Sequence, residues 1–161
     1  MTGQIVHQLF TGNALCGVDK AGRLILPAFV RVTLARRSDR PAILVGAHES
    51  DPCLVGCDPG YVDSLAEDLR RRRLLDEVIA PGAHHPRARR IFGFLEEAGL
   101  DRSGAIRLSP MMRRRARIDD LALVLGTGDM FEIWSLSVAL ESGDPGLADL
   151  AAFHLDIPQA A

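Results

Sequence analysis

The sequence predicts an α+β fold made of two copies of one unit, and three observations support this. The stretch VDKAGRLILP, Val18 to Pro27, returns 82 positions later in the looser form LDRSGAIRLSP, Leu100 to Pro110. Each copy reads as a four-residue turn that begins with Asp and ends with Gly, a short strand, and a Pro that opens a helix. The elements that follow come in the same order twice. Two such units, each near the size at which one core becomes marginal, are expected to interlock.

The two turns contain the residue types that their conformation needs. Asp19 matches Asp101, and Gly22 matches Gly104. Asp can bond to the backbone of its own turn, and Gly adopts a positive φ without steric cost. Side chains alternate between the two faces of the strand that follows. The sequence therefore predicts one buried apolar row in each copy, which is Leu24 and Leu26 in the first and Ile106 and Leu108 in the second.

Patterns after each turn predict the remaining strands and helices. After the first copy we expect a helix over 28–37, strands over 43–46 and 54–55, and a helix opened by Asp58 and Pro59. After the second we expect a helix over 111–117 capped by Ser109, a strand over 121–126, a turn, a strand over 131–134, and a helix opened by Ser135. A short amphipathic helix is expected from Asp144 onward, where Leu147, Leu150 and Leu155 would dock on a neighbouring subunit.

These motifs also carry a family resemblance. The segments FTGNALCGVDKAGRLILP and PCLVGCDPGYVDSL, followed later by LDRSGAIRLSP and VLGTGDMFEIW, resemble the MraZ family of bacterial transcription regulators from Phe10 to about Glu141. The resemblance implies an AbrB-like swapped-hairpin double-repeat β-barrel with flanking helices. It implies a sequence-specific DNA-binding regulator of the division and cell-wall gene cluster, which binds promoter direct repeats as a ring-shaped homo-oligomer of the octamer or dodecamer class. Such a regulator is cytoplasmic and nucleoid-associated.

The resemblance and the composition divide the chain into five segments. These are an N-terminal extension over 1–9, a first AbrB-like repeat over 10–80, a linker and helix over 81–95, a second AbrB-like repeat over 96–142, and an acidic C-terminal tail over 143–161. The stretch 80–86, APGAHHP, is expected to be the linker itself because of its Pro and Gly content.

The candidate DNA-binding residues lie in and beside the two turns. They are Asp19, Lys20, Gly22, Arg23, Arg102 and Arg107. From the residues alone, Asp19 and Arg23 form a surface ion pair across the first turn. The resemblance instead implies that this Asp-x-x-x-Arg element contacts DNA.

This chain departs from the family pattern at two positions in these turns. The usual Lys before the turn glycine is Ala21, and Lys20 stands one position earlier. In the second copy Ala105 replaces the expected Arg, and Arg102 and Arg107 lie nearby. We therefore expect the first hairpin to dominate DNA contact, and the second to serve in packing or ring formation.

Overall charge gives little support to a nucleic-acid binder. The net charge is -2 and the pI is about 6.2. Of the 21 acidic groups, four lie beyond residue 140, where no Lys or Arg occurs, so residues 1–140 hold 17 acidic groups against 19 basic ones. Eighteen of the basic groups are Arg, which suits bidentate contacts with phosphate or guanine but is also explained by genome composition. The negative net charge is thus due to the acidic tail, and residues 1–140 are mildly basic.

Two arginine runs have a structural and a functional interpretation. In LRRRRLL, 69–75, carboxylates lie four residues before or after the arginines, which predicts a helix face covered by ion pairs. The run MMRRRAR, 111–117, is expected to place both methionines inward and its arginines outward. Contact with DNA or with another subunit is the alternative for the first run. For the second run a solvated helix face is the main interpretation, and a functional contact is the alternative.

Nothing in the sequence favours catalysis or a bound cofactor or metal. Gly126 and Gly128 form a GxG without the further glycine and helix of a dinucleotide loop. The three cysteines, Cys16, Cys53 and Cys57, are expected to be reduced and apolar, and no membrane-spanning run occurs. Two rivals to the regulator stay open: an antitoxin-like AbrB-family protein with a toxin partner, and a protein-binding scaffold with lost or weak DNA contact.

Overall fold

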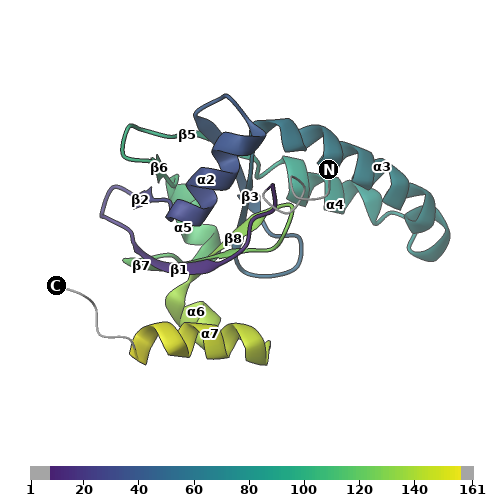
Figure 1. Cartoon of the computed structure of the whole chain (residues 1–161). Helices are drawn as coiled ribbons and strands as arrows, with labels where there is room; N and C mark the ends of the chain where they lie inside the picture. The colour runs from purple at the N-terminus through teal and green to yellow at the C-terminus, as the bar shows by residue number, and fades with distance from the viewer. Residues whose placement is uncertain (1–7, 157–161) are drawn as a thin grey trace.

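The computed structural model describes residues 8–156. Residues 1–7 of the predicted N-terminal extension and residues 157–161 of the predicted tail lie outside the described residues. The elements run in the order β1 Asn13–Gly17, β2 Arg23–Ile25, α2 Ala28–Arg37, β3 Ala42–Ala47, β4 Leu54–Cys57, η1 Pro59–Tyr61, α3 Val62–Ile79, α4 His84–Phe92, β5 Glu96–Gly99, β6 Ala105–Arg107, α5 Pro110–Ala116, β7 Leu121–Gly126, β8 Phe131–Ser135, α6 Leu136–Leu140 and α7 Pro145–Asp156. The predicted strands and helices are thus present, and the α+β class is confirmed (Figure 1).

The strands of the two copies are interleaved in one sheet. Within the described residues a six-stranded antiparallel sheet has the order β1-β7-β8-β4-β3-β5, and a separate two-stranded sheet pairs β2 with β6. The first copy supplies β1 to β4 and the second β5 to β8. Strand β1 pairs with β7, and its counterpart β5 pairs with β3, while β4 pairs with β8. The two copies therefore interlock, as expected from their small size.

A closed barrel ladder is not observed in the part of the chain that the structure describes. Strands β1 and β5 are the two edges of the six-stranded sheet. At each edge the chain enters an Asp-to-Gly turn, where backbone groups bond within the turn instead of across to another strand. The bridge Val18↔Leu24 and the bond from the Asp101 N–H to the Ala105 carbonyl connect these edges to the β2–β6 pair.

The predicted apolar rows lie at the centre of the core. Leu24 and Leu26 are fully buried, and Ile106 and Leu108 are 1% and 3% exposed. They belong to a cluster that also contains Phe10 and Phe131, whose rings meet edge to face at 5.1 Å. The period-two prediction for both hairpins is thus confirmed.

A second apolar cluster holds α6 and α7 on the sheet. Leu147 and Ala151 of α7 pack with Leu123 and Trp134, and Leu150 lies partly buried against them. This corrects the expectation that Leu147 and Leu150 dock on a neighbouring subunit, because a buried Trp in this chain already provides their partner. Leu155 is 54% exposed. Helix α7 therefore packs on the sheet with one face and is solvated on the other.

All three expected helix starts agree with the sequence, and two of them carry a side-chain cap. The hydroxyl groups of Ser109 and Ser135 accept the N–H groups of Met112 and Val138, at 3.2 and 3.5 Å. Asp58 and Pro59 open η1 as expected, but the Asp58 side chain makes no such cap. Its carboxylate is buried and forms an ion pair with Arg37 at 2.8 Å. The Asp58 side chain therefore points toward this guanidinium and not toward the N–H groups of the helix.

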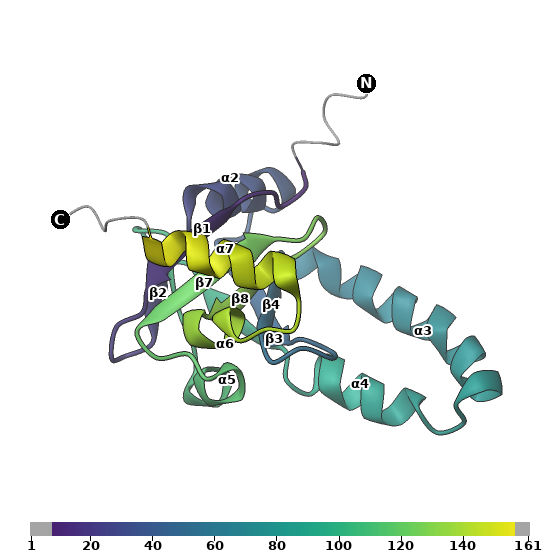
Figure 2. The same cartoon turned by 90° about the horizontal axis from the view of Figure 1, so that it is seen from below.

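Helices α3 and α4 form an arm that projects beyond the sheet (Figures 1 and 2). The predicted linker 80–86 is shorter than expected, because α4 begins at His84. Pro86 fits inside the first turn of α4, where no intrahelical N–H bond is required. Leu69 of α3 is buried at the base of the arm, whereas the C-terminal half of α3 is largely exposed.

Candidate nucleic-acid interface

The first turn is fixed by its own aspartate. Oδ1 of Asp19 accepts the backbone N–H groups of Ala21 and Arg23, both at 2.9 Å. The Gly22 N–H donates to the Asp19 carbonyl at 3.0 Å. Gly22 has a φ of +84°, and a Cβ there would lie 2.5 Å from the carbonyl oxygen of Leu108. Glycine is thus required both by the turn and by contact with the second hairpin.

The second turn repeats this geometry. Oδ1 of Asp101 accepts the N–H groups of Ser103 and Ala105 at 2.8 and 3.1 Å, and the Gly104 N–H donates to the Asp101 carbonyl. Gly104 has a φ of +76°. The two turns are also joined to the opposite hairpins, because the Leu108 N–H donates to the Gly22 carbonyl and the Leu26 N–H to the Gly104 carbonyl.

Strands β2 and β6 form an exposed ribbon between the turns. In its register Arg23 lies opposite Arg107, and Ile25 lies opposite Ala105. Arg23, Ile25 and Arg107 lie on the face away from the core, because Leu24 and Ile106 point inward, whereas Ala105 is buried. Two cations that face each other across a strand pair repel one another. A nearby anion, either from the chain or from a ligand, would offset this repulsion.

Arg23 obtains that anion from the second hairpin. Its Nε and Nη2 donate to Oδ2 of Asp101 at 3.1 and 2.9 Å. The sequence-based pair between Asp19 and Arg23 is therefore wrong for the side chains: Asp19 binds the Arg23 backbone, and Asp101 binds the guanidinium. Two of the five N–H donors of Arg23 serve this bond, so its guanidinium also has donors directed elsewhere.

The pKa values of both turn carboxyl groups are lowered. For Asp19 the main cause is the hydrogen bond from the Arg23 backbone N–H, and the positive charges of Arg23 and Arg107 add to it. For Asp101 the main cause is the bond from the Ala105 backbone N–H, and the Arg23 side chain adds to it. Both groups are therefore ionised at neutral pH and keep the turns intact.

Two further arginines at equivalent positions support the turns. Arg113 donates from Nη1 to the Lys20 carbonyl at 3.0 Å, and its side chain packs against Gly22. Arg31 stands 82 positions earlier, packs against Gly104 and donates to the Leu26 carbonyl. Each helix thus covers the turn of the opposite copy. Sequence reasoning missed both residues, although the repeat spacing marks them as a matched pair.

The structure brings the six candidate residues together on one ribbon and its two turns. Lys20, Arg102 and Arg107 are exposed, Arg23 is half-exposed, and Gly22 is buried. Ala105 is 2% exposed, so the position at which the family pattern expects Arg is covered here. The first hairpin therefore carries the cation that directly follows its turn, and the second does not.

The two other arginine runs lie outside the ribbon. In α3, Arg72 contacts Asp68 at 3.8 Å and Arg73 contacts Glu77 at 3.5 Å, which confirms two of the predicted ion pairs. In α5, Met112 is buried as expected, but Met111 is 44% exposed because only one of two adjacent positions can face the core.

Residues 8–156 contain no group of three or more His, Cys, Asp or Glu side chains that could hold a metal ion. Burial raises the pKa of Cys16 to about 11 and that of Cys57 to about 12, and it also raises that of Cys53. The three thiols are thus protonated at neutral pH and are poor nucleophiles or ligands. No helix among the described residues is long and apolar enough to cross a membrane.

Comparison with known proteins gives one consistent group of relatives, although no protein-family model matches the chain. The chain is 30% identical over 155 residues to a protein of Xylella fastidiosa named transcriptional regulator MraZ, a match that covers 88% of this chain and 99% of the relative. Proteins with the same name from Coxiella burnetii and Aromatoleum aromaticum are 27% identical over 156 residues and 30% identical over 131 residues. The first of these matches covers 93% of this chain and 95% of the relative, and the second covers 79% and 81%.

Proposed function

Because this chain belongs to the MraZ family of transcriptional regulators, we propose that it binds promoter DNA in a sequence-specific manner through the β2–β6 ribbon. The proposed targets are direct repeats upstream of the division and cell-wall gene cluster. The proposed active form is a ring-shaped homo-oligomer in the nucleoid-associated pool of the cytoplasm. We also propose that the exchange of strands between the two copies is the AbrB-like swapped-hairpin arrangement.

One observation carries this proposal: the exposed face of the ribbon holds two opposed arginines flanked by the cations of both turns. Arg23 and Arg107 face each other in register, and Lys20 and Arg102 project from the turns at its two ends. Such a cluster on a two-stranded ribbon suits the phosphates and base edges of a DNA groove. The remaining charge of the molecule does not need to be basic, because several tethered copies raise the effective concentration at neighbouring repeats.

The first hairpin is proposed to provide most of the sequence-specific contact. Arg23 projects at the outer face directly after the Asp19 turn, whereas the equivalent Ala105 has no polar side chain. Asp101 holds the Arg23 guanidinium at 2.9 Å and so limits its directions. A pre-oriented guanidinium loses less freedom when it binds a base edge or a phosphate.

The direct test is binding of the purified full chain to duplex DNA from upstream of its own gene cluster, at two salt concentrations. Arg23→Ala is expected to lower affinity by about 1–3 kcal/mol for each site, which is about 5- to 150-fold, and to reduce the salt slope by about 0.9 for each lost phosphate contact. Arg107→Ala is expected to weaken binding less.

Arg40→Ala is the matched control. Arg40 lies outside the ribbon, and like Arg23 it is an exposed arginine in an ion pair with a carboxylate, that of Glu97. Its loss removes one positive charge and one surface pair, so it should leave DNA affinity nearly unchanged. Equal losses in Arg107→Ala and Arg23→Ala would contradict the dominance of the first hairpin. An intact chain that does not bind this DNA would favour the protein-binding scaffold.

A further inference from the structure

The arm carries an exposed apolar stripe at the end that lies farthest from the sheet. Its residues are one, four and five positions apart in α3, so they form one continuous strip along the helix. The exposed fractions are 72% for Leu74, 62% for Leu75, 82% for Val78 and 77% for Ile79. A contiguous apolar surface of this kind on a folded chain marks an interaction site.

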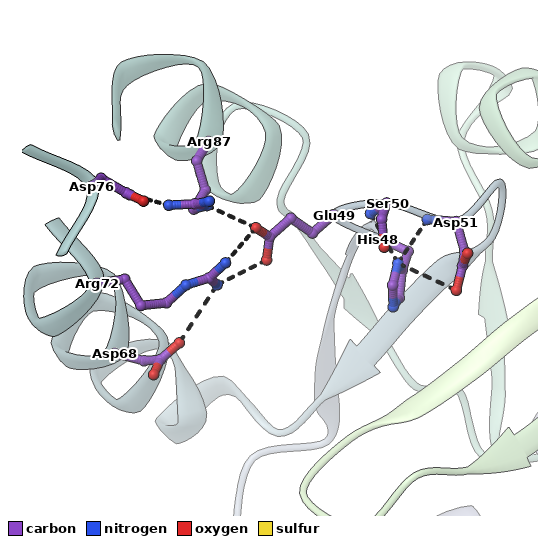
Figure 3. A network of polar contacts seen from close by, with 8 residues as sticks. All are labelled: His48, Glu49, Ser50, Asp51, Asp68, Arg72, Asp76 and Arg87. Atoms are coloured by element: carbon purple, nitrogen blue, oxygen red, sulfur yellow. Dashed lines mark hydrogen bonds and ion pairs between the residues drawn. The ribbon is translucent and has the colours of Figure 1, made fainter. Parts of the chain in front are cut away.

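A network of ion pairs joins both helices of the arm to the β3–β4 connection, so the stripe is presented on a positioned element. Glu49, in the connection between β3 and β4, accepts hydrogen bonds from Arg72 of α3 at 2.7 and 2.9 Å and from Arg87 of α4 at 2.8 Å (Figure 3). Arg87 also pairs with Asp76, and these side chains are at most 35% exposed. One carboxylate of the body therefore holds both helices of the arm.

Cations border the stripe. Arg70 and Arg71 are exposed and lie four residues before Leu74 and Leu75, so they continue the same two rows of the helix. The partner of this surface should therefore combine an apolar centre with carboxylates beside it.

The outer face of α7 has that composition. Phe153 is 61% exposed, and the exposed Asp149 and Asp156 lie four residues before it and three residues after it on the same face. The opposite face of α7 is occupied, because Leu147 and Ala151 pack on the sheet. The chain has no Lys or Arg beyond residue 140 to neutralise these carboxylates.

We propose that the α3 stripe of one chain docks on the outer face of α7 of a second copy. Phe153 then packs among the four apolar residues of the stripe, and the two aspartates lie beside Arg70 and Arg71. The arm and α7 occupy separate sides of the molecule (Figure 2), so each chain offers one stripe and one α7 face. A contact between two different surfaces repeats from chain to chain and closes into a ring when the rotation allows. This inference rests on the proposed homo-oligomer and names the contact that builds it.

The experiment measures the mass of the full chain in solution by light scattering after size-exclusion chromatography. The wild type is expected to form an assembly well above the 17.5 kDa of one chain. Val78→Glu with Ile79→Glu should reduce the mass to that of a monomer, and so should Phe153→Glu. All three side chains are exposed, so the far-ultraviolet circular dichroism should be unchanged. Val32→Glu is the matched control, because Val32 is 47% exposed on α2, and it should keep the wild-type mass.

A mixing experiment tests that the two surfaces are different. The Phe153→Glu chain has an intact stripe, and the Val78→Glu, Ile79→Glu chain has an intact α7 face. An equimolar mixture should therefore form a dimer with one good contact, although each variant alone is a monomer. Reversal of charge at Asp149 and Asp156 to Arg should also break the assembly, and Arg70→Asp with Arg71→Asp in the same chain should restore it.

Several outcomes would overturn the inference. A wild-type monomer, the wild-type mass in either apolar variant, or a failure of the charge reversal to restore assembly would each exclude this contact. If the double variant Arg70→Ala with Arg71→Ala loses DNA affinity but keeps the wild-type mass, the arm binds DNA and not a second copy. The mass measurement contains no DNA, so this inference can fail while the proposed DNA binding stands, and the reverse is also true.

Discussion

At the scale of single residues, the two turn aspartates link protonation to the structure of the ribbon. Each carboxylate accepts two backbone N–H groups of its own turn, and Asp101 also holds Arg23. The pKa of each group is lowered, chiefly by a backbone hydrogen bond. Because the folded-state pKa lies below the unfolded value of about 3.9, the stabilisation is present above that value and is lost as the pH falls through the folded pKa.

The corresponding prediction concerns the loss of stability toward urea as the pH becomes acidic. We expect Asp19→Asn with Asp101→Asn to make the urea midpoint less dependent on pH at acidic values, since the amide oxygen still accepts the turn N–H groups but does not titrate. The midpoint should be measured from neutral pH down to the acid transition. Asp39→Asn, a change in an exposed aspartate outside both turns, is the control. If the urea midpoint of the double variant falls with acidic pH as steeply as that of the wild type, these carboxylates do not cause the loss of stability.

The ion-pair partner of Arg23 could not be predicted from the sequence. Asp19 is only four positions away and was the natural choice for its ion pair. The structure pairs β2 with β6, and this register brings Asp101 from 78 positions away to the guanidinium. The charge of a side chain can be read locally, but its partner depends on which strands pair. The same reason explains why the burial of Ala105 could not be predicted.

At the scale of elements, the repeat predicted the turns, the buried rows and most strands and helices. Spacing within each copy was sufficient for this, because turn chemistry and period-two alternation are local. The pairing of β1 with β7 and of β5 with β3 is not local, and neither is the direction of Asp58 toward Arg37. The arm was predicted only as a charged helix and a linker, since its position depends on the contact of Glu49 with both helices.

Gly22 provides the element-scale prediction, because it joins the first turn to the second hairpin. In Gly22→Ala the added Cβ meets the Leu108 carbonyl oxygen at 2.5 Å, and the φ of +84° strains any side chain. We expect the free energy of unfolding to fall by more than about 1 kcal/mol, as measured by urea denaturation. Gly128→Ala is the matched control, since Gly128 has a φ of +93° but open space at its Cβ position. Equal losses in the two variants would mean that contact with the second hairpin adds nothing.

At the scale of the whole molecule, different elements of residues 8–156 carry the different proposed binding surfaces. The β2–β6 ribbon presents the candidate DNA contacts, while the arm and α7 present complementary apolar and charged faces (Figures 1 and 2). Interlocking of the two copies makes the sheet a common support for all three. Changes on one surface should therefore leave the others intact, unless they alter the supporting contacts.

Glu49 is such a supporting contact, and it gives the last prediction. Glu49→Gln removes the charge that binds Arg72 and Arg87, while the size of the side chain stays the same. Since the three groups are partly exposed, we expect a loss of about 1 kcal/mol, confined to the arm. Hydrogen–deuterium exchange should then become about fivefold faster in α3 and α4 and stay unchanged in β7 and β8. Glu97→Gln, which breaks the exposed pair with Arg40, should leave the arm unaffected. Unchanged exchange in the arm of Glu49→Gln would mean that apolar packing at Leu69, and not this network, holds the arm in place.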